Sequence, residues 1–177
     1  MANVQFDSAR SRATVSLERQ LEASPAEVWS DLTDRDRLRT WFPCDVIVKG
    51  GAWRVGATIS FPFPAEVIDL TLRGEVLECE EQTRLSYTWG EDVLTFELHH
   101  EKGSTTLVLR DELDAATAAR NAAGWDDCLD RLFGRPVSPG AWKTHFNEYR
   151  QRFEGILGPQ EGPPAGYKGT DHPTEGD

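Results

Sequence analysis

The sequence predicts an α+β protein in which one antiparallel sheet is covered by a long C-terminal helix. Three observations predict this class. Apolar residues alternate with period two over most of residues 44–113, turn signals such as Gly50-Gly51 and Lys102-Gly103 separate the alternating segments, and the period becomes helical after Asp114. Consecutive strands joined by short turns form an antiparallel meander, and the apolar face of such a sheet needs a helix to cover it.

Composition limits the class of partner. The 177 residues suit one domain with tails, and 38% hydrophobic with 28% charged residues is typical of a globular protein. The chain has 19 basic and 30 acidic residues, a formal net charge of −11. Nucleic acids and anionic membrane surfaces both require clustered Lys and Arg, so we expect neither as a partner.

Cysteine spacing and hydropathy predict a soluble, cytoplasmic protein. Cys44, Cys79 and Cys128 are far apart and form no C-x-x-C pair, which favours reduced thiols. The N-terminal residues contain no continuous apolar segment, and no run approaches the length of a membrane span. We therefore expect neither a signal peptide nor a transmembrane helix.

The first elements follow from local signals. Residues 1–11 are polar and are expected to be flexible, whereas residues 12–21 alternate between apolar and polar and predict a half-buried strand. In the sequence SPAEVW, Ser24 is a predicted N-cap with Pro25 at the first helical position and Glu27 completing a capping box. A second short helix, capped by Thr33 or Asp36, should end near Thr40.

The remaining elements fill the chain to residue 157. Six more strands are predicted, at 44–49, 57–62, 66–80, 83–90, 92–101 and 104–113. An amphipathic stripe predicts a long helix at 115–133, and a second helix at 138–157 carries aromatic residues at heptad-like spacing. The predicted organisation is thus a single domain over 12–157 that includes this extra helix. The segment 158–177 is rich in Gly and Pro and is predicted to be disordered.

Several motifs in this order resemble a known family. They are Pro25 to Trp29, Trp41-Phe42, Gly74-Glu75-Val76, Arg84 to Trp89, Ser104 to Leu109 and Gly124-Trp125. Over roughly residues 13–133 the chain resembles START-like proteins of the SRPBCC superfamily, and it is most similar to the AHSA1-like branch, named after the activator of Hsp90 ATPase. The resemblance implies a helix-grip fold: a seven-stranded antiparallel sheet around a long C-terminal helix, with two short helices after the first strand. It also implies a cavity for hydrophobic small molecules, and some relatives are cyclases.

The alternation and the resemblance together predict which side chains line that cavity. They are Trp41, Phe61, Leu72, Leu85, Tyr87, Trp89, Phe96, Leu98, Leu107, Leu109, Trp125 and Leu129. Trp41 in the sequence Trp41-Phe42-Pro43 is either a wall of the cavity mouth or an anchor of the short helices. The Tyr87 hydroxyl is either a group that orients the ligand or an ordinary core tyrosine.

Motifs for metal, cofactor or nucleophilic chemistry are missing from the sequence. His99 and His100 are adjacent on a strand and point to opposite faces, and no H-E-x-x-H, G-x-S-x-G or P-loop motif occurs. We therefore predict no metal and no cofactor. The charged pairs Arg73/Glu75 and Arg110/Glu112 are expected to face solvent, where an ion pair contributes little.

The predicted function is the binding of a small hydrophobic or amphipathic molecule in an internal cavity. Two alternatives stay open. A cavity enzyme of cyclase or hydrolase type would need a titratable pair facing inward, and a co-chaperone-like interaction module would need an exposed apolar patch. A homodimer is an additional possibility, through a rim at Trp53 and Phe63 or through the helix that carries Trp142 to Ile156.

Overall fold

The computed structural model describes residues 1–168 and contains one eight-stranded antiparallel sheet with four α-helices. The strand order across the sheet is β1-β2-β8-β7-β6-β5-β4-β3. The strands are β1 (Asn3–Asp7), β2 (Arg12–Leu21), β3 (Ile47–Val48), β4 (Thr58–Pro62), β5 (Thr71–Glu80), β6 (Arg84–Trp89), β7 (Asp92–Glu101) and β8 (Ser104–Asp114). The helices are α1 (Pro25–Thr33), α2 (Arg35–Trp41), α3 (Ala118–Leu132) and α4 (Ala141–Leu157).

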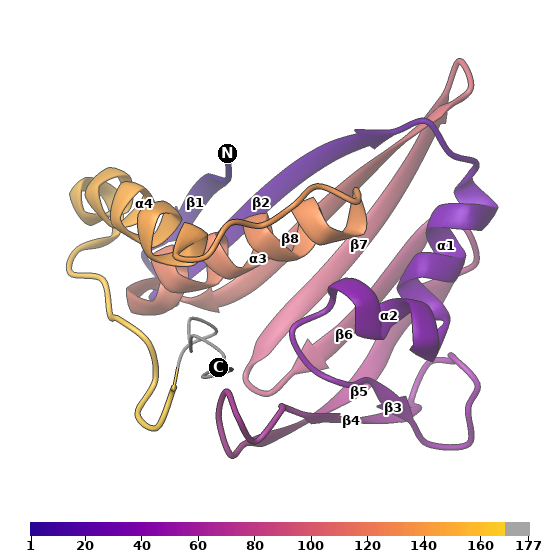
Figure 1. Ribbon diagram of the computed structural model, residues 1–177, viewed down its shortest axis with the longest axis horizontal. Helices are drawn as coiled ribbons and strands as arrows, with labels where there is room; N and C mark the ends of the chain where they lie inside the picture. Colours follow the sequence, from indigo (N-terminus) through magenta and orange to yellow (C-terminus); the bar gives the residue numbers. More distant parts are fainter. Residues whose placement is uncertain (169–177) are drawn as a thin grey trace, which may run out of the picture.

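The helices are distributed over one face and one end of the sheet (Figure 1). Helix α3 runs across the face formed by β2 and β8, α1 and α2 lie together at the far end, and α4 lies beside α3 and β1. No helix of the described residues is long and apolar enough to span a membrane. The arrangement is an α+β sheet gripping a long helix, in agreement with the predicted class.

The sheet has one strand more than predicted, because residues 3–7 form β1. This strand pairs antiparallel with β2, with Val4 opposite Val15. The preceding Ala2 is buried, and its N–H donates to the hydroxyl of Tyr149 at 2.7 Å. The expected flexible N-terminus is therefore an edge strand, held by partners that lie far away in the sequence.

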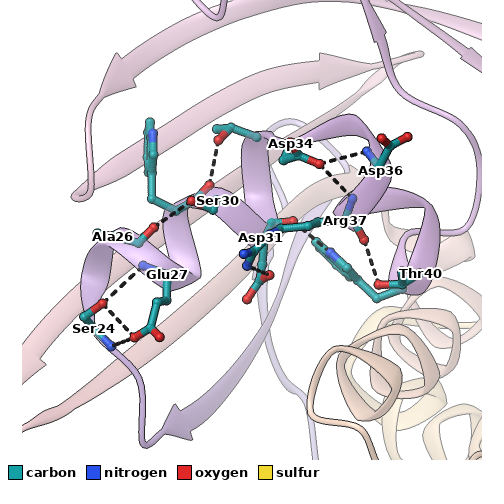
Figure 2. Close-up of polar contacts among 12 residues, drawn as sticks. Ser24, Ala26, Glu27, Ser30, Asp31, Asp34, Asp36, Arg37 and Thr40 are labelled. Atoms are coloured by element: carbon teal, nitrogen blue, oxygen red, sulfur yellow. Dashed lines mark hydrogen bonds and ion pairs between the residues drawn. The ribbon is translucent and has the colours of Figure 1, made fainter.

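The predicted N-cap of the first short helix is confirmed, whereas the N-cap of the second is a different residue from the two predicted (Figure 2). The Ser24 hydroxyl accepts from the N–H of Glu27, and the Glu27 carboxylate accepts from the N–H of Ser24 at 2.8 Å. The cap of α2 is Asp34 rather than Thr33 or Asp36, since its carboxylate accepts from two backbone N–H groups of the first turn. Asp34 thus serves both helices, because its backbone N–H donates to the carbonyl of Ser30 at the end of α1 while its carboxylate caps α2.

The middle strands are shorter than the alternation predicted. Strand β5 begins at Thr71 rather than 66, and β3 contains only Ile47 and Val48. Residues 63–70 form a loop in which the carbonyl of Pro64 accepts from Val67 and Ile68. Proline has no N–H for a sheet ladder, so Pro62 and Pro64 end the regular pairing here.

The two long helices also begin later than predicted. Residues 115–117 form a 3₁₀ turn whose predicted cap, Asp114, accepts from the N–H of Ala116 at 2.8 Å. Helix α3 follows, and α4 begins at Ala141 instead of Ser138 and packs along α3. Its aromatic residues Phe146, Tyr149 and Phe153 are buried, so this helix belongs to the core of the domain.

Residues 158–168 follow a defined path over the start of α3, although they were expected to be disordered. Gln160 binds the backbone at both Ala115 and Ala119, and the N–H of Glu161 donates to the carbonyl of Ala116. Further along, the N–H of Lys168 donates to the carbonyl of Val67 at 2.8 Å. The rest of the predicted disordered tail, 169–177, lies outside the described residues.

Candidate functional site

A cavity of about 580 Å³ opens at one end of the grip. Its lining residues come mainly from the turn after β6, the loop before β5, helix α3 and the C-terminal segment. Its apolar and aromatic walls are formed by Pro43, Phe63, Val67, Ile68, Leu70, Leu72, Trp89, Cys128, Trp142, Pro163, Pro164 and Tyr167. Its polar and charged walls are formed by Arg12, Glu91, Asp92, Asp114, Thr117, Arg120, Asn121, Asp127 and Arg131.

Ring contacts hold the apolar walls in place. Phe63 from the loop lies against Trp89 at a centroid distance of 6.1 Å, and Trp142 of α4 lies against Tyr167 at 5.9 Å. Gly90 turns the chain with a positive φ of +67° and lies beside the Leu72 side chain. The apolar walls thus come from six segments that are separated in the sequence.

Gly124 leaves open space on the helical side of the cavity. It lies in the middle of α3, and a Cβ at this position would meet only Trp142 Nε1, at 4.0 Å. A larger residue would project into the cavity, since Gly124 is part of its lining. This glycine keeps volume free at a cost in helix propensity of about 1 kcal/mol.

The polar end of the cavity is organised around Arg12 and Asp92. Arg12 Nη2 donates to the carbonyls of Glu91 at 3.0 Å and Glu112 at 2.6 Å, and it lies 3.8 Å from Asp92 Oδ1. Burial raises the pKa of Asp92 to about 6, against the opposing effect of the Arg12 charge. Asp92 therefore changes its charge near neutral pH while it lines the cavity.

A second carboxyl, Asp111, lies behind Asp92 in the core. Asp111 Oδ2 accepts from Trp125 Nε1 at 2.8 Å, while its buried Oδ1 has no partner among the described residues. Burial and the nearby Asp92 raise the pKa of Asp111 well above its usual value. Of these two acids, Asp92 lines the cavity and Asp111 is fully buried behind it.

The opposite end of the cavity contains Asp127 and Cys128. The Asp127 carboxylate interacts with His145 Nδ1 at 3.0 Å, and burial raises the pKa of Asp127. Burial also raises the pKa of the Cys128 thiol to about 12. A thiol with this pKa is not a nucleophile at neutral pH.

Of the side chains predicted to line the cavity, Leu72 and Trp89 do so. The others pack between the sheet and α3 as a solid core: Trp41, Phe61, Leu85, Tyr87, Phe96, Leu98, Leu107, Leu109, Trp125 and Leu129. The alternation identified the inward face correctly. Aromatic side chains fill the space behind it, so the cavity lies at the end of the grip instead of along its length.

Trp41 and Tyr87 illustrate this difference. Trp41 Nε1 donates to the carbonyl of Asp31 at 2.9 Å, and its ring meets Phe96 edge-on, so Trp41 anchors the short helices. Its neighbour Pro43 is the member of this motif that reaches the cavity. The Tyr87 ring lies between Trp53 and Phe61, away from the cavity lining.

Sequence reasoning missed the charged residues of the site. Asp92 shares its strand face with Leu94 and Phe96, and Asp111 shares its face with Leu109 and Leu113, all of which point inward. An acidic residue in register with an apolar face was the signal available in the sequence. No signal in the sequence pointed to Pro163, Pro164 and Tyr167, because their position depends on how the C-terminal segment crosses α3.

The other charged and aromatic candidates lie elsewhere. Arg73, Glu75, Arg110 and His99 are exposed, away from α3, as the alternation predicted for the first three. Trp53, which was proposed as part of a dimer interface, donates from Nε1 to the carbonyl of Thr33 at 2.8 Å. Its indole N–H therefore binds within its own chain. Within residues 1–168, no group of three or more His, Cys, Asp or Glu is arranged to hold a metal ion.

Comparison with known proteins identifies the family. Residues 22–134, more than half of the chain, match the family described as Activator of Hsp90 ATPase homolog 1-like protein. The chain belongs to this family. No curated protein matches it.

Solved structures share the fold of this AHSA1-like chain. A conserved protein of unknown function from Enterococcus faecalis, EF2215, is 21% identical with a TM-score of 0.72, over 88% of this chain and 91% of that one. CalU16 from Micromonospora echinospora is 19% identical with a TM-score of 0.68, over 89% and 97%. DynU16, from the dynemicin biosynthetic locus, is 25% identical with a TM-score of 0.58, over 67% and 45%.

Proposed function

We propose that this protein binds a small amphipathic molecule in the cavity at the end of the grip. The observation that carries the proposal is the cavity itself, about 580 Å³ with aromatic and aliphatic walls and several charged groups. Pockets for small molecules are typically about 300–1,000 Å³, mostly apolar, with a few polar groups that orient the ligand. The location of a relative, DynU16, in a biosynthetic locus is consistent with a small-molecule ligand.

Filling the cavity tests this function. Gly124→Leu places a side chain in the open space without a backbone clash, and it replaces a helical glycine by a good helix former. Gly155→Leu is the matched control, because Gly155 is an exposed glycine in α4, outside the cavity lining, with nothing within 4 Å of a Cβ. Both variants should fold, and they differ in whether they fill the cavity.

The measurement is native mass spectrometry of freshly purified protein, followed by solvent extraction of any released compound. We expect the wild type and Gly155→Leu to carry the same small molecule and Gly124→Leu to carry none. If the purified proteins are all bare, binding of 2-(1-naphthyl)ethanol by calorimetry replaces the co-purified ligand in the same comparison. Equal binding by Gly124→Leu and Gly155→Leu would remove the cavity as the binding site.

A further inference from the structure

Asp92 lines the cavity, and its carboxylate oxygens accept no hydrogen bond from the described residues. Its side chain is 21% exposed, and its ion-pair partner, Arg12 Nη2, is 3.8 Å away. Among residues 1–168, no donor forms a hydrogen bond with either carboxylate oxygen. A mostly buried carboxylate without donors favours a ligand that supplies one.

Other groups at this end of the cavity also offer acceptors. The Asn121 amide nitrogen donates to the carbonyl of Thr117 at 3.1 Å, which directs its Oδ1 elsewhere, and no described residue donates to that oxygen. Asp114 uses Oδ1 to accept from the N–H of Ala116, while its Oδ2 has no hydrogen bond in the described part of the chain. Three neighbouring side chains thus have free acceptor oxygens.

The nearby arginines each use one guanidinium nitrogen to bind backbone carbonyls of the chain. Arg12 Nη2 donates to two backbone carbonyls, those of Glu91 and Glu112. Arg120 Nη1 donates to the carbonyl of Gly162 at 3.0 Å and lies 3.5 Å from Glu161 Oε2. These contacts hold both guanidinium groups against the C-terminal segment and the β6–β7 turn. The Asp92 carboxylate, in contrast, accepts no hydrogen bond from residues 1–168, so a donor on the ligand would fill its capacity.

We propose that the molecule bound here carries a protonated amine on an apolar body and that the amine pairs with the Asp92 carboxylate. This inference rests on the proposed function and names its ligand class. The apolar body would lie against Phe63, Leu72 and Trp89, next to the carboxylate. A charge-assisted hydrogen bond in a partly desolvated site is stronger than a neutral one, so the amine would give selectivity as well as affinity.

The charge state of Asp92 makes this pairing dependent on pH. The groups that act on Asp92 are Arg12 on β2, Arg120 on α3, Glu91 in the turn, and Asp114 and Asp111 on β8. With a pKa of about 6, Asp92 is ionised at pH 8 and about nine-tenths protonated at pH 5. An aliphatic amine stays protonated at both pH values, because its pKa is about 10. Affinity for the amine should therefore fall about tenfold between pH 8 and pH 5.

Three probes of one shape test the proposal by isothermal titration calorimetry. They are 2-(1-naphthyl)ethylamine, 2-(1-naphthyl)ethanol and 1-naphthylacetate, which present a cation, a neutral hydroxyl and an anion on the same ring system. At about pH 8, we expect the wild type to bind the amine at least fivefold more tightly than the alcohol, and the acetate most weakly. At about pH 5, the preference for the amine over the alcohol should disappear.

Asp92→Asn removes the charge with almost no change in shape, and Asp69→Asn is its matched control. Asp69 is an exposed acid of the loop before β5 and is not part of the cavity lining. We expect Asp92→Asn to bind the alcohol normally and to lose the preference for the amine, while Asp69→Asn keeps it. If Asp92→Asn does not fold, the pH comparison on the wild type takes its place.

The outcomes separate this inference from the proposed function. Binding of the alcohol without a preference for the amine, or a preference for the acetate, would overturn the amine proposal and leave the binding function standing. An amine preference that survives in Asp92→Asn or at about pH 5 would also overturn it. Failure of all three probes to bind the wild type would overturn the amine inference. It would overturn the proposed function as well only if the purified wild type also carries no small molecule.

Discussion

Gly74 of β5 lies close against the backbone of β6. A Cβ at this position would collide with the carbonyl oxygen of Thr88 and would lie 2.9 Å from the Phe61 ring. The N–H of the next residue, Glu75, donates to the Thr88 hydroxyl at 2.9 Å, and the pairing of the two strands shifts register just beyond, between Val76 and Glu78. The glycine of the Gly74-Glu75-Val76 motif is therefore required by the packing of two backbones.

Gly74→Ala should destabilise the protein by about 1–3 kcal/mol, because the backbone oxygen of Thr88 cannot move away as a flexible side chain could. The free energy of unfolding would be measured by urea denaturation. Gly155→Ala in the exposed part of α4 is the control and should be neutral or slightly stabilising. A Gly74→Ala variant as stable as this control would contradict the close approach of β5 and β6.

The roles of single residues could be predicted where they depend only on neighbours in the sequence. Ser24, Pro25 and Glu27 act within one helical turn, and the structure confirms the cap they predict. Asp92 and Asp111 were missed because period-two alternation was read from apolar residues alone. Their burial depends on the strands and the helix packed around them, which a local pattern does not describe.

At the scale of elements, the start of α3 has an unusual cap. Thr117 occupies the N-cap position, but its side chain forms no capping hydrogen bond. Instead Gln160, from the segment after α4, accepts from the N–H of Ala119 at 2.9 Å and donates to the carbonyl of Ala115 at 2.9 Å. The same segment continues to the cavity wall, so the cap of α3 and the closing of the cavity depend on one stretch of chain.

Gln160→Ala should lower the free energy of unfolding by about 1–2 kcal/mol, since it leaves a helix N–H and a carbonyl without their partners. Hydrogen exchange should also become faster in residues 160–168. Gln151→Ala, at an exposed position of α4, is the matched control and should change neither quantity. Equal effects of the two substitutions would show that Gln160 does not hold the segment.

Elements held by distant partners were the ones the sequence did not predict. Strand β1 and residues 158–168 have weak local propensity and were expected to be flexible or disordered. A buried network joins β1, β2, α3 and α4: the Tyr149 hydroxyl and Arg19 both bind the carboxylate of Asp126, and the N–H of Ala2 donates to Tyr149. Hydrogen bonds across more than a hundred residues leave no periodic signal.

For the whole molecule, the family resemblance predicted the grip, and packing decided where its cavity lies. The rings of Trp41, Phe42 and Trp125 pack together between the sheet and α3, and the ring centroids of Phe42 and Trp125 are 5.5 Å apart. These rings fill the interior between the sheet and α3. The cavity therefore lies at the end of the sheet where the C-terminal segment crosses α3. Whether aromatic side chains fill or line a grip depends on their rotamers and neighbours, which alternation along the sequence does not specify.

The charge balance of the molecule leads to a prediction about stability and pH. Asp92 has a raised pKa of about 6 in the folded protein, whereas an unfolded Asp has a pKa of about 3.9. Between these values, the folded state binds a proton that the unfolded state lacks, so the contribution of Asp92 is fully present below about pH 4 and is lost as the pH rises through about 6.

Asparagine resembles the protonated acid at every pH, so Asp92→Asn should lack this dependence. Relative to the variant, the wild type should therefore gain about 2 kcal/mol of unfolding free energy as the pH falls from about 7 to about 4. Carboxylates that do not interact with Asp92 cancel in the difference, including Asp45, whose pKa the hydrogen bond from Arg35 holds well below its usual range. Urea denaturation of both proteins across this range measures the difference. A difference that is flat, or that shrinks toward acid, would mean that Asp92 is not the desolvated carboxylate on which the cavity's preference for an amine depends.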